Sequence, residues 1–167
     1  GVPFHWVVEF VEVPEADGGS RSVNFDIIVG NPPYGDIVGD AGKVFLENYK
    51  TGGINEVSAQ FVERQLQLLE NGGYFGNITT LRLVYQSGIE EYHEVLKSNL
   101  ESTMIACFGF RPSRIFDNAH IDTGVATGRK DTGSDNAGAI LTTDFTLFTD
   151  ENRQKKIESL EYASTDG

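Results

Sequence analysis

The sequence predicts an α/β fold built on a doubly wound sheet, and two observations lead to this class. Compact β-branched runs alternate along the chain with segments of helical period, which is the pattern of βαβ units. The chain has 167 residues, of which 39% are hydrophobic, enough for one domain, or part of a larger one, with a real core.

The first third of the chain predicts one strong strand between irregular segments. Residues 4–13 are predicted as a short strand or extended segment, and residues 14–22 as a loop by composition. Residues 25–30 (FDIIVG) form a β-branched run typical of a parallel strand that is buried on both faces. Residues 31–53 are rich in glycine and polar side chains, and they predict a loop.

The middle of the chain predicts helix, strand and helix in turn. Residues 57–70 place apolar side chains at helical spacing, and Asn71-Gly72-Gly73 is predicted to end that helix. Residues 74–79 read as the next strand. Residues 87–99 are predicted as a second helix, with Ser87 as its N-cap and Glu90 at capping-box spacing.

The last third predicts further strands and a polar end. Strands are expected at 103–109, 121–127 and 139–148, with a turn-rich loop over 128–138. The predicted domain therefore spans residues 1–149, and residues 150–167 form a polar tail that is helical or frayed.

The charge of the chain sets limits on its partners. The formal net charge is −12, with 25 acidic against 13 basic residues. Affinity for DNA depends on Lys and Arg at the phosphates, so the charge by itself argues against a polyanionic partner. Two explanations would reconcile it with DNA binding. The basic surface lies in another part of the protein, or the host is salt-loving, since high salt screens the self-repulsion of an acidic surface.

The sequence also limits cofactor and compartment. Cys107 lies alone in an apolar run and is expected to be an inert core thiol. The three histidines are widely spaced and have no cysteine partners, so no metal site is expected. No apolar run reaches membrane-spanning length and the first residues lack a signal-peptide pattern, which predicts a cytoplasmic protein without a membrane partner.

The motif that points to chemistry is Asn31-Pro32-Pro33-Tyr34, directly after the 25–30 strand. Ligands of doubly wound sheets bind at the carboxyl ends of strands. The two prolines stiffen an extended backbone and have no N–H, so the carbonyls are available as acceptors. The side-chain oxygen of Asn31 and the carbonyl of Pro32 can accept both hydrogens of an exocyclic amino group. Tyr34 offers a ring face on which a purine can stack.

Several segments, taken in order, carry a family resemblance. FDIIVGNPPYGD resembles motif IV of the amino-methyltransferases, specifically the N6-adenine DNA methyltransferases of restriction–modification and related phage-defence systems. HWVVEF (5–10) resembles a segment found upstream of motif IV in the large single-chain enzymes that combine modification with restriction. LLENGGYFGNIT (68–79) is similar to motif VI, and RPSRIF (111–116) to motif VIII. The resemblance covers roughly residues 4–148.

The resemblance implies a Rossmann-like class I methyltransferase sheet, S-adenosylmethionine as cofactor and DNA as partner. The residues that would hold the target adenine are Asn31, Pro32, Pro33 and Tyr34. Phe116 would pack against the other side of a flipped base. Arg111 and Arg114 would contact phosphate, with helix capping or ion pairing as the alternative role.

One departure from the family concerns the cofactor. The family's glycine-rich cofactor loop lies well upstream of motif IV, whereas only 30 residues precede Asn31 here, and they contain no strand–glycine turn–helix pattern. Residues 39–43 (GDAGK) lack the spacing of a phosphate loop. We therefore expect the second half of the sheet, with an incomplete cofactor site whose other half lies on another chain or in a missing part.

Two other functions stay open at this point. Enzymes that methylate the side-chain amide of glutamine in release factors also use Asn-Pro-Pro-Tyr, by the same chemistry. The chain could also be a non-catalytic remnant or a partner subunit that docks with a protein carrying the cofactor loop.

Overall fold

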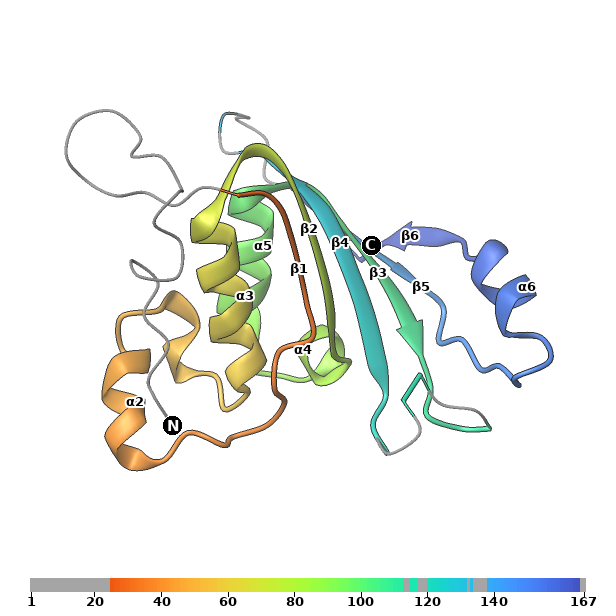
Figure 1. Ribbon diagram of the computed structural model, residues 1–167, viewed down its shortest axis with the longest axis horizontal. Helices are drawn as coiled ribbons and strands as arrows, with labels where there is room; N and C mark the ends of the chain where they lie inside the picture. The colour runs from red at the N-terminus through yellow and green to blue at the C-terminus, as the bar shows by residue number, and fades with distance from the viewer. Residues whose placement is uncertain (1–24, 113–114, 117–119, 132, 134–137, 166–167) are drawn as a thin grey trace.

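The structure, a computed structural model, describes residues 25–112, 115–116, 120–131, 133 and 138–165. The strand and loop predicted over residues 4–22 lie outside these residues. The described part is an α/β arrangement in which a mixed sheet packs against helices (Figure 1), which confirms the predicted class. None of its helices has both the length and the apolar character needed to cross a bilayer.

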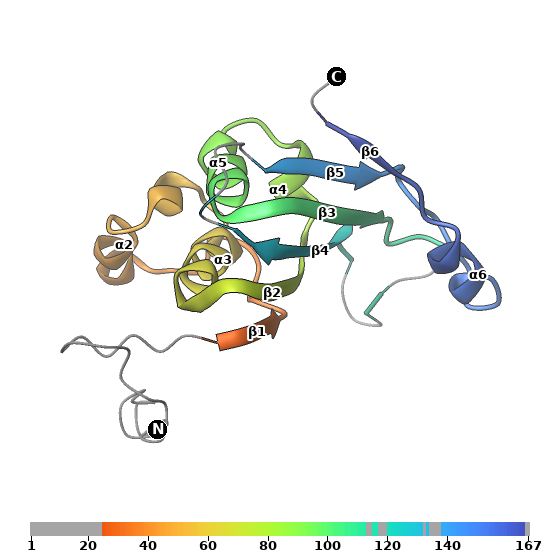
Figure 2. The same cartoon turned by 90° about the horizontal axis from the view of Figure 1, so that it is seen from above.

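The sheet has six strands in the order β1-β2-β4-β3-β5-β6 (Figure 2). Their bounds are β1 Phe25–Gly30, β2 Leu69–Thr80, β3 Leu100–Phe108, β4 Thr123–Lys130, β5 Ala139–Thr143 and β6 Tyr162–Ser164. β1, β2, β3 and β5 run in the same direction, while β4 lies antiparallel between β2 and β3. The carboxyl ends of β1, β2 and β3 therefore meet at one edge of the sheet.

Two helices cover one face of this sheet. The helices are α2 Asp40–Leu46, α3 Val57–Leu68, α4 Arg82–Tyr85, α5 Glu90–Asn99 and α6 Arg153–Glu158, with a 3-10 turn, η1, at Lys50–Gly53. α3 and α5 lie side by side against the sheet (Figures 1 and 2). The core between them is built from buried side chains that include Val62, Leu66, Phe75, Tyr92, Leu96 and Ile105. Burial of such a side chain stabilises the fold by about 1.5–3 kcal/mol.

A smaller cluster lies apart from this core and joins β3 to the C-terminal segment. The rings of Phe108 and Phe148 meet edge to face, with their centroids 5.9 Å apart. Residues 150–165, expected as a polar tail, contain α6 and β6, and β6 pairs with β5.

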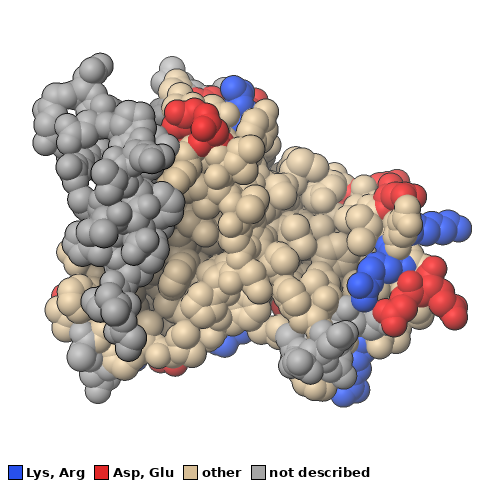
Figure 3. Space-filling view, viewed as in Figure 1, with Lys and Arg blue, Asp and Glu red and all other residues tan. Residues whose placement is uncertain are grey.

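β1 differs from its prediction in burial. The strand forms over the predicted residues, but Ile27 and Val29 expose 63% and 75% of their surface. The prediction that it is buried on both faces is wrong, because β1 is an edge strand of the described sheet and α3 and α5 cover only one face. Figure 3 shows that the surface over β1 and β2 has few charged side chains, whereas such groups gather around α6.

The predicted loop over residues 31–53 is also wrong in part, since it contains α2 and η1. A loop was predicted because the glycines of residues 31–53 have a low helix propensity. η1 is held instead by a residue outside the segment. The Glu63 carboxylate of α3 accepts hydrogen bonds from the Lys50 and Thr51 N–H groups, at 2.9 Å each.

The helix predicted over 57–70 ends earlier, at Leu68, and β2 begins at Leu69. The predicted glycine cap is wrong because a distant cation takes its place. The Lys130 ammonium donates to the carbonyls of Leu66 and Leu69, at 2.5 and 2.6 Å. A cation at the end of a helix also complements the helix dipole.

The second predicted helix begins at Glu90 rather than after Ser87. The Ser87 cap is wrong, because Gly88 turns the chain at a φ of 80° and leaves Ile89 at the N-cap without a side-chain hydrogen bond.

The strands predicted at 74–79, 103–109 and 121–127 are present with shifted ends. β4 continues to Lys130, inside the predicted 128–138 loop, and β5 ends at Thr143 rather than at 148.

Candidate active site at the carboxyl ends of the strands

The Asn-Pro-Pro-Tyr motif lies at the carboxyl end of β1, as predicted. We call residues 31–35 the motif loop. Pro32 is buried, Asn31 and Pro33 are exposed, and Tyr34 is half-buried. Just before the loop, a Cβ on Gly30 would lie 2.6 Å from the Asn77 Oδ1 atom of β2, so a larger residue here would have to displace the Asn77 side chain.

Two side chains of the motif loop contact each other directly. The Tyr34 hydroxyl donates to the Asn31 Oδ1 atom at 2.6 Å, and it lies 3.3 Å from the Ile78 carbonyl of β2. Burial, and then the nearby charge of Glu56, raise the pKa of Tyr34 above its usual value of 10.0. The raised pKa extends to higher pH the range in which the protonated hydroxyl donates to Asn31.

The motif loop is also bound to the first residues of α3. The Gly35 N–H donates to the Glu56 Oε1 atom, and the Gly35 carbonyl accepts from the Val57 N–H at 3.1 Å. Gly35 has a φ of 88°, a conformation that favours glycine. Sequence reasoning missed Glu56, because no local pattern relates it to a loop 21 residues earlier.

The other predicted site residues follow β3, whose carboxyl end lies at the same edge of the sheet. Arg111 is exposed, and its guanidinium carbon lies 5.2 Å from the centroid of the Phe110 ring. Phe116 is half-buried. Arg114 lies outside the described residues. Asp122, from the segment before β4, accepts a hydrogen bond from the Phe110 N–H at 3.1 Å, which joins the two segments.

A cavity of 470 Å³ opens at this edge, between α4 and the segments that flank β3 and β4. Its walls combine several rings with a few polar groups, and they include Arg82, Tyr85, Gln86, Phe110, His120 and Phe145. Its volume falls in the range of small-molecule sites. Sequence reasoning missed it, because its lining comes from segments far apart in the chain. Beside it, Cys107 is buried, and burial raises the pKa of its thiol.

The described residues provide little that could hold a cofactor or metal. No three His, Cys, Asp or Glu side chains among them converge on a metal position. The first-turn N–H groups of Gly42 and Lys43 in α2 both donate to the Gly39 carbonyl, so they are not directed at a phosphate. The described part of the chain contains no glycine turn that leads directly from a strand into a helix, the arrangement that holds the cofactor in this fold class.

Known structures share this fold. The chain superposes on the restriction-modification enzyme LlaBIII bound to DNA with a TM-score of 0.64 and 13% identity, covering 85% of this chain and 12% of that one. It also superposes on a Listeria monocytogenes protein assigned to the class I S-adenosylmethionine-dependent methyltransferases. That match has a TM-score of 0.59 and 15% identity, and it covers 85% of this chain and 43% of that chain. These likenesses identify the fold as that of class I methyltransferases.

Sequence comparison identifies the family. A Methanocaldococcus jannaschii protein assigned as a type II restriction enzyme and methyltransferase is 27% identical over 120 residues, which are 72% of this chain and 9% of that protein. The chain thus spans less than a tenth of this relative. The sequence model of the Eco57I restriction-modification methylase family matches residues 2–116, which are more than half of the chain. The chain therefore belongs to that family.

Proposed function

We propose that this chain forms the adenine-holding part of an S-adenosylmethionine-dependent N6-adenine DNA methyltransferase in a restriction–modification system. The observation that supports this most directly is the position of Asn31. Its side-chain oxygen lies at the carboxyl end of β1 and is held there by the Tyr34 hydroxyl at 2.6 Å.

The chemistry of the adenine amino group explains why hydrogen-bond acceptors are needed at this position. The adenine amine is a poor nucleophile, because its lone pair is delocalised into the ring. Acceptors on its two hydrogens favour a more tetrahedral nitrogen and free that lone pair for attack. An amide oxygen has two lone pairs, so Asn31 can accept from the adenine while it still accepts from Tyr34. The Pro32 carbonyl would be the second acceptor.

Tyr34 would act in two ways. Its ring would stack on the flipped adenine, an interaction worth about 1–3 kcal/mol per base, which offsets much of the cost of unstacking. Its hydroxyl would orient Asn31 by donating to the Asn31 Oδ1 atom at 2.6 Å. Phe116 would pack against the other side of the base.

DNA contacts would come from the residues that follow β3 and from outside this chain. Arg111 is exposed at the same edge as the motif loop, where a guanidinium can reach phosphate. Arg114 would assist it. A chain with a net charge of −12 supplies few further cations, so most phosphate contacts would lie on other parts of the protein.

The methyl donor would be held mainly elsewhere. S-Adenosylmethionine supplies an electrophilic methyl group when bound, but the described residues do not by themselves fit it, since they include no glycine turn between a strand and a helix. The cofactor-binding half would lie beside β1, either on the same polypeptide or on a separate chain. Ile27 and Val29 are exposed on the face of this edge strand that α3 and α5 do not cover, and they make that face apolar.

Methyl transfer from labelled S-adenosylmethionine tests this function. With the cofactor-binding half present, label should appear in adenine-containing duplex DNA and, after digestion, in N6-methyladenine. A release factor serves as the parallel substrate. Label in a release-factor glutamine or in cytosine, with none in adenine, would contradict the proposal.

Calorimetry tests the division of the site. The isolated chain is expected to bind S-adenosylmethionine weakly. Tight one-to-one binding would refute an incomplete cofactor site, although it would leave the adenine assignment standing.

A further inference from the structure

A buried carboxylate lies at the junction of the motif loop and α3. Glu56 exposes 4% of its surface, and its Oε1 atom accepts from the Gly35 N–H and from the Ser58 hydroxyl, the latter at 3.0 Å. The Gly35 carbonyl in turn accepts from Val57. Both polar groups of Gly35 are therefore bound to two consecutive residues at the start of α3.

This attachment matters because of the composition of the loop. Pro32 and Pro33 have no N–H, so they cannot donate a backbone hydrogen bond to the rest of the fold. Asn31 is exposed and accepts a hydrogen bond from Tyr34, which belongs to the same loop and lies 3.3 Å from the Ile78 carbonyl of β2. The hydrogen bonds of the Gly35 peptide unit are thus a principal link between the motif loop and α3.

The second oxygen of Glu56 sets it apart from an ordinary capping residue. Its Oε2 atom is buried and lacks a hydrogen-bond partner, and the nearest cation, Arg82 Nη1, lies 4.0 Å away. A buried oxygen without a hydrogen bond costs free energy, typically about 1–3 kcal/mol, and the long ion pair with Arg82 offsets only part of it. Glu56 is thus held by the two hydrogen bonds to its Oε1 atom and by the distant charge of Arg82, and its position is fixed at the junction with Gly35.

We propose that Glu56 is a positioning residue for methyl transfer. It binds Gly35 and so holds the motif loop at the position from which Asn31 and Tyr34 engage the adenine. The proposal rests on the function proposed above and deepens it.

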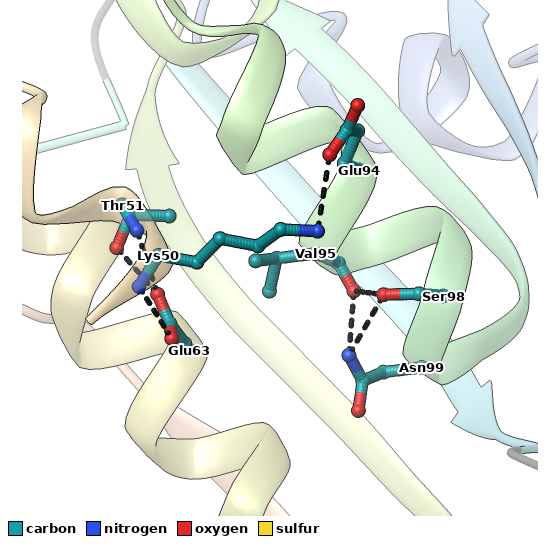
Figure 4. Close-up of polar contacts among 7 residues, drawn as sticks. All are labelled: Lys50, Thr51, Glu63, Glu94, Val95, Ser98 and Asn99. Atoms are coloured by element: carbon teal, nitrogen blue, oxygen red, sulfur yellow. Dashed lines mark hydrogen bonds and ion pairs between the residues drawn. The ribbon is translucent and has the colours of Figure 1, made fainter. Parts of the chain in front are cut away.

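The same helix offers a matched control. Glu63 lies within α3, seven residues after Glu56, which is the N-cap residue of that helix, and it exposes 8% of its surface. Its carboxylate accepts from the Lys50 and Thr51 N–H groups and from the Thr51 hydroxyl, at 2.9, 2.9 and 2.8 Å (Figure 4). It fixes η1, not the motif loop. The two glutamates therefore share residue type and burial and belong to one helix and its N-cap, but their carboxylates bind different segments.

The experiment compares Glu56→Ala, Glu56→Gln and Glu63→Ala in the complete enzyme, with the cofactor-binding half present. Glu56→Ala should lower kcat about 100-fold, the scale expected when a reacting group is misplaced by about 1 Å, with KM for DNA changed by less than about twofold. Glu56→Gln should recover much of the rate, because its amide oxygen can accept from Gly35. Glu63→Ala should lower the unfolding temperature but leave kcat within about threefold.

Three results would overturn the proposal: a Glu56→Ala enzyme with unchanged kcat, a loss of rate no larger than in Glu63→Ala at equal stability, or a glutamine variant as slow as the alanine variant. Hydrogen exchange of the Gly35 amide, followed by NMR in this chain, gives a readout independent of activity. Protection should be lost in Glu56→Ala and kept in Glu63→Ala. If the wild-type enzyme methylates no adenine, the proposed function fails, and the exchange data still decide whether Glu56 holds the loop.

Discussion

The two ends of the sheet use their polar side chains differently. At the carboxyl end, three buried side-chain oxygens of the described residues have no hydrogen-bond partner, in Glu56, Gln60 and Asn77. At the opposite end, cations are used to close the fold. Lys130 binds the carbonyls of Leu66 and Leu69, and Arg129 donates to the Gly72 carbonyl at 3.3 Å.

This difference separates activity from stability. Unpartnered buried oxygens cost free energy and tend to mark places where function outweighs packing. Lys130 and Arg129, by contrast, stabilise a helix end and a turn through their hydrogen bonds to backbone carbonyls. Substitutions in the motif loop at the carboxyl end should therefore change the rate of methylation more than the stability, and substitutions at the other end should do the reverse.

Asn31→Ala should have the largest effect. Removal of the side-chain acceptor should lower kcat roughly 100- to 1000-fold, the range found when one preorganised hydrogen-bonding group is lost from a transition state. Asn31 is exposed, so the free energy of unfolding should change little. Single-turnover methylation and urea unfolding measure the two quantities. A variant that loses stability but keeps its rate would break the proposed separation.

Tyr34→Ala should come next. Loss of the stacked ring should lower the rate about 10- to 100-fold, which corresponds to about 1–3 kcal/mol. Tyr34→Phe keeps the ring but loses the hydrogen bond to Asn31, and it should lower the rate only about 2- to 10-fold. Equal losses in the two variants would mean that the hydroxyl, not the ring, is the important group. Full activity in Tyr34→Ala would exclude the stacking role.

Lys130→Met tests the opposite end. The variant removes two hydrogen bonds from a charged donor at the end of α3, and it should lower the free energy of unfolding by about 1–2 kcal/mol. Arg129→Met is the control, because its hydrogen bond to Gly72 is longer, at 3.3 Å, and its ion pair with Glu101, at 3.8 Å, is exposed, so the loss should be smaller. Activity of both variants below the unfolding temperature should stay within about twofold of wild type.

The sequence predicted those features that depend on local pattern. The β-branched run gave β1, the helical period gave most of α3 and α5, and the prolines located the motif loop after a strand. It could not predict contacts between distant residues. Glu56 and Gly35 are 21 residues apart, and Lys130 and Leu66 are 64 apart, so neither pairing follows from periodicity.

The errors have the same origin. A glycine cap for α3 was predicted because Gly72 and Gly73 follow it, yet the helix ends where Lys130 reaches it from β4. The burial of β1 was predicted from its apolar residues alone. Whether Ile27 and Val29 are covered depends on what packs beside the strand, which an apolar run does not specify.

Glu70→Gln should have the smallest effect, and the size of that effect depends on pH. Glu70 of β2 shares a hydrogen bond with Asp26 of the adjacent strand, and this bond, followed by the charge of Asp26, raises the pKa of Glu70. A raised pKa means that the folded state binds the proton more tightly than the unfolded state. The stabilising contribution is therefore complete below the ordinary pKa and is lost as the pH rises through the raised value.

At neutral pH the two carboxylates repel each other, so Glu70→Gln should raise the unfolding temperature slightly at pH 7. The gain should disappear near pH 4, where the wild-type pair holds a proton. Glu161→Gln removes the same charge from another exposed position, and it controls for the general effect of a less acidic chain. A gain of equal size in both variants would trace the effect to net charge, whereas a pH-dependent gain confined to Glu70→Gln would assign it to the pair at this end of the sheet.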